Sequence, residues 1–348
     1  MLAYVYNSEK DLGLKEVPDP QTKRGSAVIK VNATSICGTD LRTFRFGSGK
    51  IKAPRIIGHE VIGTIIDVGK EIRGFAVGDR VQIAPAIGCG KCPSCLSGHS
   101  NLCDDLKTIG FDYDGTFAEY MEIPAEAFLR DYVTKVPASI PSEEAVLAEP
   151  IACIMNAQQY LHIEKGNTVV IFGSGFIGTM HAKLALQQGA TKVLMIDINE
   201  SRISMAKSIL PELIGVNSLK ENLAEIVRVE TGGRGADVAI TACSVGSAQV
   251  DAMNIIAKRG RVSLFGGLPN VTTGFIDSNI IHYKEVSVYG SHASNVSQNR
   301  KVLDLISAGG FSLRPFIKNP FPLQEIDRAF AELNKENIVK AVLVPGKK

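Results

Sequence analysis

Four of the seven cysteines lie close together, and their spacing is typical of a metal site. Cys89, Cys92, Cys95 and Cys103 fall within fifteen residues in the pattern C-x2-C-x2-C-x7-C. Four thiolates in one loop would close a tetrahedral zinc site with no position left for a substrate, so we predict a structural zinc. An iron–sulfur cluster and four unrelated thiols are the alternatives. The bacterial ferredoxin pattern has a shorter final gap and a following proline, which this loop lacks.

A second set of metal-ligand types is spread along the first half of the chain. Cys37 precedes His59 and Glu60 by twenty-two and twenty-three residues, and Glu149 follows much later. One thiolate, one imidazole and one or two carboxylates form a zinc site with an exchangeable position. Zinc in such a site lowers the pKa of an alcohol oxygen bound to it. Spacing alone does not establish this, because Cys37 would also suit a small buried apolar position and His59 a hydrogen-bonded loop.

A glycine fingerprint indicates a dinucleotide site. The string Gly173-Ser174-Gly175-Phe176-Ile177-Gly178 follows the apolar run Thr168–Phe172 and opens a helix-like segment. The first glycine would permit a tight turn, the second the approach of a pyrophosphate, and the third close helix–strand packing. The N-terminus of the helix would offer its free N–H groups to the phosphates.

An acidic residue stands where a ribose hydroxyl would be bound. Asp197 ends the next apolar run, nineteen residues beyond Gly178. A carboxylate there repels a 2′-phosphate, so NAD is favoured over NADP, although Arg202 leaves room for NADP or flanks the adenine. Ile177 and Gly266 complete the expected cofactor contacts. The alternative is a glycine-rich loop in an unrelated α/β enzyme, with Asp197 as a helix cap.

The pattern of apolar runs changes along the chain. The first half has short β-type segments between glycines and prolines: Val28–Ala33, Val61–Val68 and Val81–Ile83. The second half alternates six strand-like runs with helix-like segments, which predicts a doubly wound parallel sheet. The strands are Thr168–Phe172, Lys192–Ile196, Leu213–Val216, Val238–Ala242, Arg261–Phe265 and Val286–Tyr289; the helices are Ile177–Gln188, Ser201–Leu210, Lys220–Glu230 and Ser247–Ala257. The tail adds helices at Gln298–Ala308 and Leu323–Asn334 and a strand at Lys340–Val344.

Charge and hydropathy exclude several classes of partner. The 348 residues include 38 Lys and Arg against 36 Asp and Glu, a net charge of +2. Such a balance gives no reason to expect nucleic acid or anionic lipid. No apolar run reaches the ~20 residues that cross a bilayer. Charged residues at positions 9–11 precede any apolar region of a signal peptide, so we expect a cytoplasmic protein with no membrane partner.

Several motifs occur here in one order, and together they resemble the zinc-dependent medium-chain dehydrogenase/reductase (alcohol dehydrogenase) family. The motifs are Cys37-Gly38-Thr39-Asp40, Gly58-His59-Glu60-x2-Gly63, Val77-Gly78-Asp79-Arg80-Val81, the four-cysteine loop, Gly115-x-Phe117-Ala118-Glu119-Tyr120 and the glycine fingerprint. The resemblance covers nearly the whole chain. Glu149-Pro150 resembles the polyol branch, with its sorbitol, galactitol-phosphate and threonine dehydrogenases.

The resemblance implies roles for individual residues. Cys37, His59 and Glu60 would hold a catalytic zinc, with Glu149 as a fourth ligand or water holder. Asp40 would orient His59, and Thr39 would take the alcohol proton and pass it toward the nicotinamide ribose.

One departure from the family pattern concerns the proton relay. Many relatives carry a histidine where this chain has Arg42, and a guanidinium cannot release a proton near neutral pH. Water or the ribose hydroxyl would then complete the relay. Arg42 would alternatively contact the cofactor or an anionic substrate group, or remain a solvated charge.

The resemblance also implies a substrate class and two domains. Arg42, Phe44, Phe111 and His292 would line the substrate site, and their mixed polarity favours a polyol oxidised to a ketose. A phosphorylated polyol, threonine and an inactive NAD-binding sensor are the alternatives. We expect a GroES-like β-rich catalytic domain over residues 1–150, completed by 290–348, and a Rossmann domain over 151–289. The family forms homodimers or homotetramers.

Overall fold

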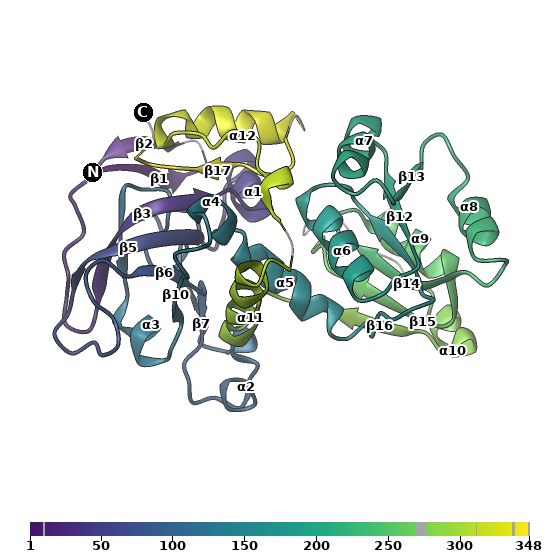
Figure 1. Cartoon of the computed structure of the whole chain (residues 1–348), viewed down its shortest axis with the longest axis horizontal. Coiled ribbons are helices and arrows are strands. Elements are labelled where there is room, and N and C mark those ends of the chain that lie inside the picture. The colour runs from purple at the N-terminus through teal and green to yellow at the C-terminus, as the bar shows by residue number, and fades with distance from the viewer. Residues whose placement is uncertain (10, 269–275, 311, 336–337, 347–348) are drawn as a thin grey trace. The chain divides into compact units, whose positions relative to one another are not determined.

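The computed structural model describes residues 1–9, 11–268, 276–310, 312–335 and 338–346, which form two compact units (Figure 1). The first unit contains Met1–Ala152 and Ala293–Lys348, and the second contains Cys153–His292. The chain first passes from the first unit to the second within the helix α5 (Ala148–Gln158), whose first turn contains Glu149 and Pro150. Proline is tolerated in a first turn because the N–H it lacks has no partner within the helix. Within the described residues, no helix has the length and apolar character that crossing a bilayer requires.

The second unit is built on six parallel strands in the order β13-β12-β11-β14-β15-β16. The strands are β11 (Thr168–Phe172), β12 (Lys192–Asp197), β13 (Ile214–Asn217), β14 (Ala236–Thr241), β15 (Ile256–Leu264) and β16 (Ser287–Gly290). The helices are α6 (Phe176–Gln187), α7 (Glu200–Ile209), α8 (Leu223–Glu230), α9 (Gly246–Ile255) and α10 (Ser278–Lys284). The predicted α/β fold class, with its Rossmann-type parallel sheet, is confirmed. The helix α10 lies where the sequence analysis assigned none.

Both faces of this sheet are buried, which explains why its strands are continuous apolar runs. In β11, Val169 and Ile171 pack with the side of the sheet that α6 and α7 cover. The alternate residues Val170 and Phe172 pack with the opposite side, under α8 and α9. Because side chains alternate along a strand, the four residues from Val169 to Phe172 divide between two cores.

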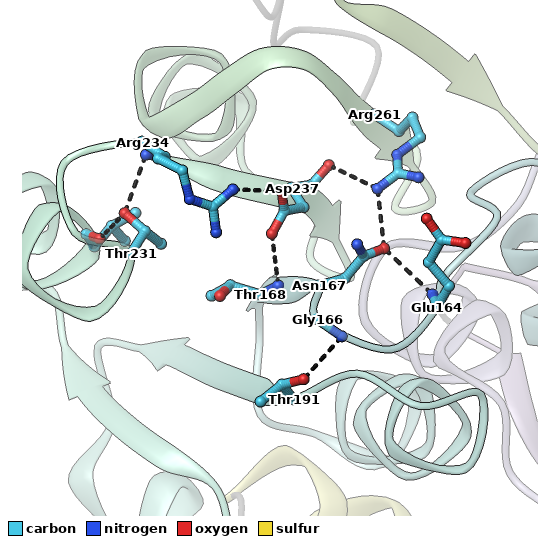
Figure 2. A network of polar contacts seen from close by, with 11 residues as sticks. Glu164, Gly166, Asn167, Thr168, Thr191, Thr231, Arg234, Asp237 and Arg261 are labelled. Carbon is cyan, nitrogen blue, oxygen red and sulfur yellow. Dashed lines mark hydrogen bonds and ion pairs between the residues drawn. The ribbon is translucent and has the colours of Figure 1, made fainter.

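Polar side chains fasten the amino ends of β11 and β14 to β15 (Figure 2). Asp237 Oδ2 accepts a hydrogen bond from the Thr168 N–H at 2.8 Å, and its Oδ1 lies 3.2 Å from an Arg234 guanidinium nitrogen. Arg261 donates to Asn167 Oδ1 at 3.0 Å and to the Asp237 carbonyl at 3.3 Å. The network joins the starts of β11 and β14 to β15, at the edge opposite the glycine fingerprint.

The first unit is mostly β-structure, as expected. Its main sheet has the order β10-β6-β5-β3-β17, with β9 also paired to β3, and a three-stranded sheet has the order β2-β1-β4. The strands are β1 (Leu2–Ser8), β2 (Asp11–Glu16), β3 (Ala27–Ser35), β4 (Arg55–Ile56), β5 (Glu60–Val68), β6 (Arg80–Ile83), β7 (Ala86–Ile87), β8 (Lys107–Thr108), β9 (Tyr120–Ile123), β10 (Val133–Lys135) and β17 (Val342–Leu343). The helices include α1 (Gly38–Phe46), α2 (Pro93–Leu96), α3 (Ala125–Leu129), α4 (Ser142–Ala145), α11 (Val296–Ser307) and α12 (Ile326–Asn334).

The C-terminal tail belongs to this first unit. The strand β17 pairs antiparallel with the end of β3. Phe330 of α12 is fully buried, and its ring contacts those of Tyr4 and Phe117. The Tyr4 hydroxyl donates to Asp327 Oδ1 at 2.5 Å, which ties β1 to α12. The core of the unit is therefore closed by residues from both ends of the chain.

The amino-edge network predicts the effect of one substitution. Asp237→Ala removes the acceptor of the Thr168 N–H and leaves that donor without its partner, so we expect a loss of about 1–3 kcal/mol in the free energy of unfolding. Urea unfolding followed by circular dichroism measures the loss. Asp304→Ala, which removes an exposed carboxylate from α11, serves as the control. Equal stability of Asp237→Ala and the control would contradict the assignment.

Candidate functional site

Three residues of the first unit bring metal-ligand atoms together. One ligand atom each from Cys37, His59 and Glu60 lies within 4.8 Å of the other two. Antiparallel pairing of β3 with β5 sets Ser35 opposite Glu60, and Cys37 follows β3 by two residues as the N-cap of α1. The sheet register therefore unites residues that are more than twenty positions apart in the sequence.

A carboxylate next to this cluster supports the histidine. Asp40 Oδ1 lies 3.4 Å from His59 Nδ1, an ion-pair distance longer than a good hydrogen bond. The other oxygen of Asp40 accepts from the Cys37 N–H at 2.9 Å and so caps α1. Burial acts to lower the pKa of His59, but Asp40 and then Cys37 together raise that pKa well above its ordinary value. Asp40 thus holds both the ring and the loop that carries Cys37.

Glu60 takes part in a buried ion pair that the sequence analysis missed. Its Oε2 lies 2.6 Å from Lys340 Nζ, and the two side chains are 0% and 5% exposed. The Ser35 hydroxyl donates to the same oxygen, and Lys340 also donates to the Ile36 carbonyl at 2.9 Å. Burial acts to lower the pKa of Lys340, but negative groups, Glu60 first, raise it above its ordinary value. Lys340 falls in the run predicted as the terminal strand, where the sequence carries no signal of its partner.

The remaining oxygen of Glu60 fits a bound cation. Among the described residues, Oε1 of Glu60 is buried without a hydrogen-bond partner. A buried unpaired acceptor costs free energy that a metal ion would recover. Thiolate, imidazole and carboxylate ligands together suit zinc. Glu149 is buried in the first turn of α5 and its charge acts on Lys340, but the three-residue cluster does not include it.

The four-cysteine loop also brings its ligand atoms together. The sulfurs of Cys89, Cys92, Cys95 and Cys103 lie within 4.8 Å of one another, and all four cysteines are free. Cys89 Sγ accepts from the Cys92 N–H at 3.3 Å, and backbone N–H groups lower the pKa of Cys89 to about 6. A Cβ at Gly88 would lie 2.8 Å from the sulfur of Cys95, so the loop closes around the sulfurs only with glycine there.

The glycine fingerprint of the second unit forms the turn between β11 and α6. Gly173 has φ +99°, and a Cβ on Gly178 would lie 1.7 Å from the Gly173 carbonyl oxygen. Gly175 is the N-cap of α6, and a Cβ there would meet nothing within 4 Å. Two glycines are therefore required by the turn itself, while the third borders open space in front of the helix N-terminus, where a phosphate group would fit.

Asp197 is held by four backbone and side-chain donors. Its Oδ2 accepts from the N–H and the hydroxyl of Ser174, at 2.8 and 2.7 Å. Its Oδ1 accepts from the N–H groups of Ile198 and Asn199, at 2.8 and 3.0 Å. The residue predicted to bind ribose thus also fastens the glycine loop to the end of β12. The sequence analysis did not assign a function to Ser174.

The other expected cofactor residues lie in the same unit. Ile177 is half-buried in the first turn of α6, and Arg202 is half-buried in α7. A Cβ on Gly266 would lie 2.2 Å from the Cys243 carbonyl oxygen, so the loops after β14 and β15 approach each other closely.

Comparison with known proteins decides the family. Residues 23–137 match the family model of the alcohol dehydrogenase GroES-like domain, and residues 177–308 match that of zinc-binding dehydrogenase. A zinc-type alcohol dehydrogenase-like protein of Haemophilus influenzae is 33% identical over 330 residues, 94% of each chain. L-threonine 3-dehydrogenase of Bacillus subtilis is 32% identical over 336 residues, 95% of this chain and 94% of the other. The chain belongs to the zinc-dependent medium-chain dehydrogenase family.

Solved structures of family members have the same fold. A zinc-binding dehydrogenase from Sinorhizobium meliloti bound to NADP aligns with a TM-score of 0.90 and 27% identity over 99% of both chains. Galactitol-1-phosphate dehydrogenase from Escherichia coli aligns with a TM-score of 0.88 and 25% identity, over 99% of this chain and 100% of the other. The predicted family is confirmed, and the protein is an oxidoreductase of the zinc-dependent alcohol dehydrogenase type.

In this dehydrogenase the residues expected to contact substrate have different surroundings. The Phe111 ring centroid is 6.3 Å from that of His59, beside the three-residue cluster. Phe44 stacks on Phe330 at 4.6 Å, within the core of the first unit. Arg42 is exposed on α1, where Thr39 is half-buried in the first turn. His292 is exposed at the end of the second unit, and its carbonyl accepts from Asn156 at 3.4 Å.

The raised pKa of His59 predicts a pH dependence of metal binding. Protonated His59 paired with Asp40 stabilises the metal-free protein below the ordinary histidine pKa of about 6.5. This stabilisation is lost as the pH rises through the higher pKa of the folded protein. A proton therefore competes with zinc for His59, and we expect zinc affinity of this cluster to increase with pH across that range.

Asp40→Asn provides the comparison, because the amide oxygen still accepts from the Cys37 N–H while the charge is gone. Competition with a chromophoric chelator at a series of pH values measures the affinity. The steep part of the curve should move to lower pH in the variant. Coincident curves would contradict the effect assigned to Asp40.

Proposed function

We propose that this chain is a zinc-containing NAD-dependent dehydrogenase that oxidises a secondary alcohol of a polyol to a ketone. The observation that carries the proposal is the convergence of Cys37, His59 and Glu60 within 4.8 Å, next to the buried unpaired Oε1 of Glu60. Galactitol-1-phosphate dehydrogenase and 2R,3R-butanediol dehydrogenase among the similar structures support a substrate with several hydroxyl groups.

The two domains would have different roles, one in catalysis and one in cofactor binding. Residues 1–150 with 290–348 would form the catalytic zinc domain, and residues 151–289 would bind NAD through Gly173, Gly175 and Gly178. Four further groups, Ile177, Asp197, Arg202 and Gly266, would complete the cofactor site. The four cysteines of the loop would hold a second, structural zinc.

The residues around the catalytic zinc would have separate tasks. Cys37, His59 and Glu60 would hold the ion, with Glu149 as an additional ligand or water holder and Asp40 fixing the orientation of His59. Zinc in this site supplies Lewis-acid polarisation of the substrate oxygen.

The reaction moves one hydride and one proton. NAD⁺, held by the glycine turn and Asp197, would supply the hydride acceptor, so that loss of a hydride from the carbinol carbon and of the hydroxyl proton converts the alcohol to a ketone. Thr39 Oγ would accept the hydroxyl proton and pass it to the nicotinamide ribose and then to water. Arg42 is exposed and cannot accept a proton, so it would act on substrate or cofactor charge instead.

Threonine is the second candidate substrate. Several relatives of 29–34% identity are named L-threonine 3-dehydrogenase, and they match 88–97% of this chain. Threonine is also a secondary alcohol, so the chemistry is the same. Its carboxylate would need a cationic partner, for which we propose Arg42 or His292. Arg42 and Arg45 on α1, with Lys50 and Lys52, are exposed and would equally suit a phosphorylated polyol.

Assembly and location are also proposals. We expect a homodimer or homotetramer, as in the family, without nucleic acid or membrane partners. A cytoplasmic location is supported by the seven cysteines, none of which is in a disulfide, because thiols persist in a reducing compartment.

Substitution of Cys37 tests the function. In Cys37→Ser the thiolate ligand is lost, so zinc content should fall from about two to about one per chain, and NADH formation should fall by at least about a hundredfold. A panel of sugar alcohols, their phosphates, threonine and simple secondary alcohols, followed by the absorbance of NADH, identifies the substrate. Cys153→Ser, which removes a half-buried thiol from α5, is the control. Undiminished turnover in Cys37→Ser would refute the catalytic zinc, and turnover confined to threonine would select the second candidate.

Asp197 tests the choice of cofactor. Asp197→Asn removes the negative charge but keeps an acceptor for the Ser174 donors. We expect the ratio of NADPH to NADH affinity to rise by about tenfold, since ~1.4 kcal/mol of repulsion of the 2′-phosphate is removed. Fluorescence titration of both reduced cofactors measures the ratio. Glu200→Gln neutralises a carboxylate three residues away as the control. An unchanged ratio in Asp197→Asn would contradict selection by this carboxylate.

A further inference from the structure

The backbone that carries His59 and Glu60 is held from one side by close glycine contacts. A Cβ on Gly115 would lie 2.3 Å from the Gly58 carbonyl oxygen, and one on Gly110 would lie 2.5 Å from the same atom. The Thr116 N–H donates to that oxygen at 3.2 Å. The irregular segment 115–117 therefore packs directly against residue 58, with no side chain between them.

The hydroxyls of two buried threonines, Thr34 and Thr116, form hydrogen bonds that also hold the backbone of Glu60. Thr34 Oγ1 donates to the Glu60 carbonyl at 2.7 Å and lies 2.7 Å from Thr116 Oγ1. A hydroxyl has only one hydrogen to donate. Because that of Thr34 is committed to Glu60, Thr116 must be the donor between the two threonines. The hydrogen bonds thus run in one direction, from Thr116 through Thr34 to Glu60.

We propose that Thr116 is a positioning residue for the metal cluster. It fixes the main chain at Gly58 through its N–H and at Glu60 through the hydroxyl of Thr34, and so sets the directions of the His59 and Glu60 side chains. The inference rests on the proposed function, because it assumes that these two side chains bind zinc. Thr116 contributes no ligand atom to the cluster.

Loss of the Thr116 hydroxyl would lower the fraction of molecules in which His59 and Glu60 are correctly placed to bind a metal ion. Both threonines are fully buried, so water cannot replace the lost donor. Thr34 would then turn its hydroxyl or leave an acceptor unpaired, and the Glu60 carbonyl would be less well fixed. The apparent dissociation constant of a metal rises as the binding-competent fraction falls. The four-cysteine loop, which Thr116 does not contact in these interactions, would keep its affinity.

The experiment compares metal binding at the two centres of one protein. Metal-free full-length wild type, Thr116→Val, Thr116→Ser and Thr64→Val are titrated with Co²⁺, whose absorption bands differ between a four-sulfur and a one-sulfur centre. Thr64→Val is the control, because it removes a hydroxyl from β5, the strand that carries Glu60, where Thr64 donates to Asn32. We expect Thr116→Val to weaken binding at the one-sulfur centre by about tenfold, in the range for loss of an outer-shell partner. Thr116→Ser and Thr64→Val should bind like the wild type at both centres.

Each outcome has one consequence. Equal affinity of Thr116→Val and wild type at the one-sulfur centre overturns the inference, and so does an equal loss at both centres or a loss that Thr116→Ser does not restore. If wild type binds Co²⁺ only at the four-sulfur centre, the proposed function fails as well. Should Thr116→Val not fold, Thr116→Ala removes the same hydroxyl without adding a branched methyl group and is judged by the same criteria.

Discussion

Lys340 carries a positive charge into the interior of the first unit, where it pairs with one carboxylate of the metal-ligand cluster. A buried carboxylate is tolerated only when it is paired, and Glu60 is paired with this lysine at 2.6 Å. The negative groups Cys37 and Glu149 also act on Lys340. The lysine therefore offsets part of the negative charge that a cation site requires, and it holds one oxygen of Glu60 while the other is unpaired.

This pair also explains why the C-terminal tail must return to the first unit. Lys340 and Glu60 are 280 positions apart in sequence. Pairing of β17 with the end of β3 and burial of Phe330 against Tyr4 bring the lysine to the cluster. The geometry of the ligands therefore depends on the packing of the tail, because displacing the tail would leave the Glu60 carboxylate buried without its partner Lys340.

The sequence predicts those features that local patterns encode. The bounds of β11 were predicted to the residue, because a strand buried on both faces is a continuous apolar run between polar residues. Spacing alone predicted the grouping of the four loop cysteines, whereas the grouping of Cys37, His59 and Glu60 was implied by the family resemblance. Lys340, Thr34 and Thr116 were not predictable, since their partners are set by strand register across long separations. The helix α1 was missed because it is short, its sequence is mostly polar, and its N-cap is a cysteine.

The two candidate metal centres differ in how much of the fold they need. The four cysteines come from one loop of fifteen residues, and the glycines and backbone N–H groups of this loop hold the four sulfurs together. Cys37, His59 and Glu60 come from the ends of two strands and depend on the tail, on Asp40 and on the Thr116–Thr34 hydrogen bonds. Partial opening of the main sheet would therefore separate the three ligands while the loop stays closed. A centre built in this way couples the geometry of its ligands to the integrity of the whole first unit.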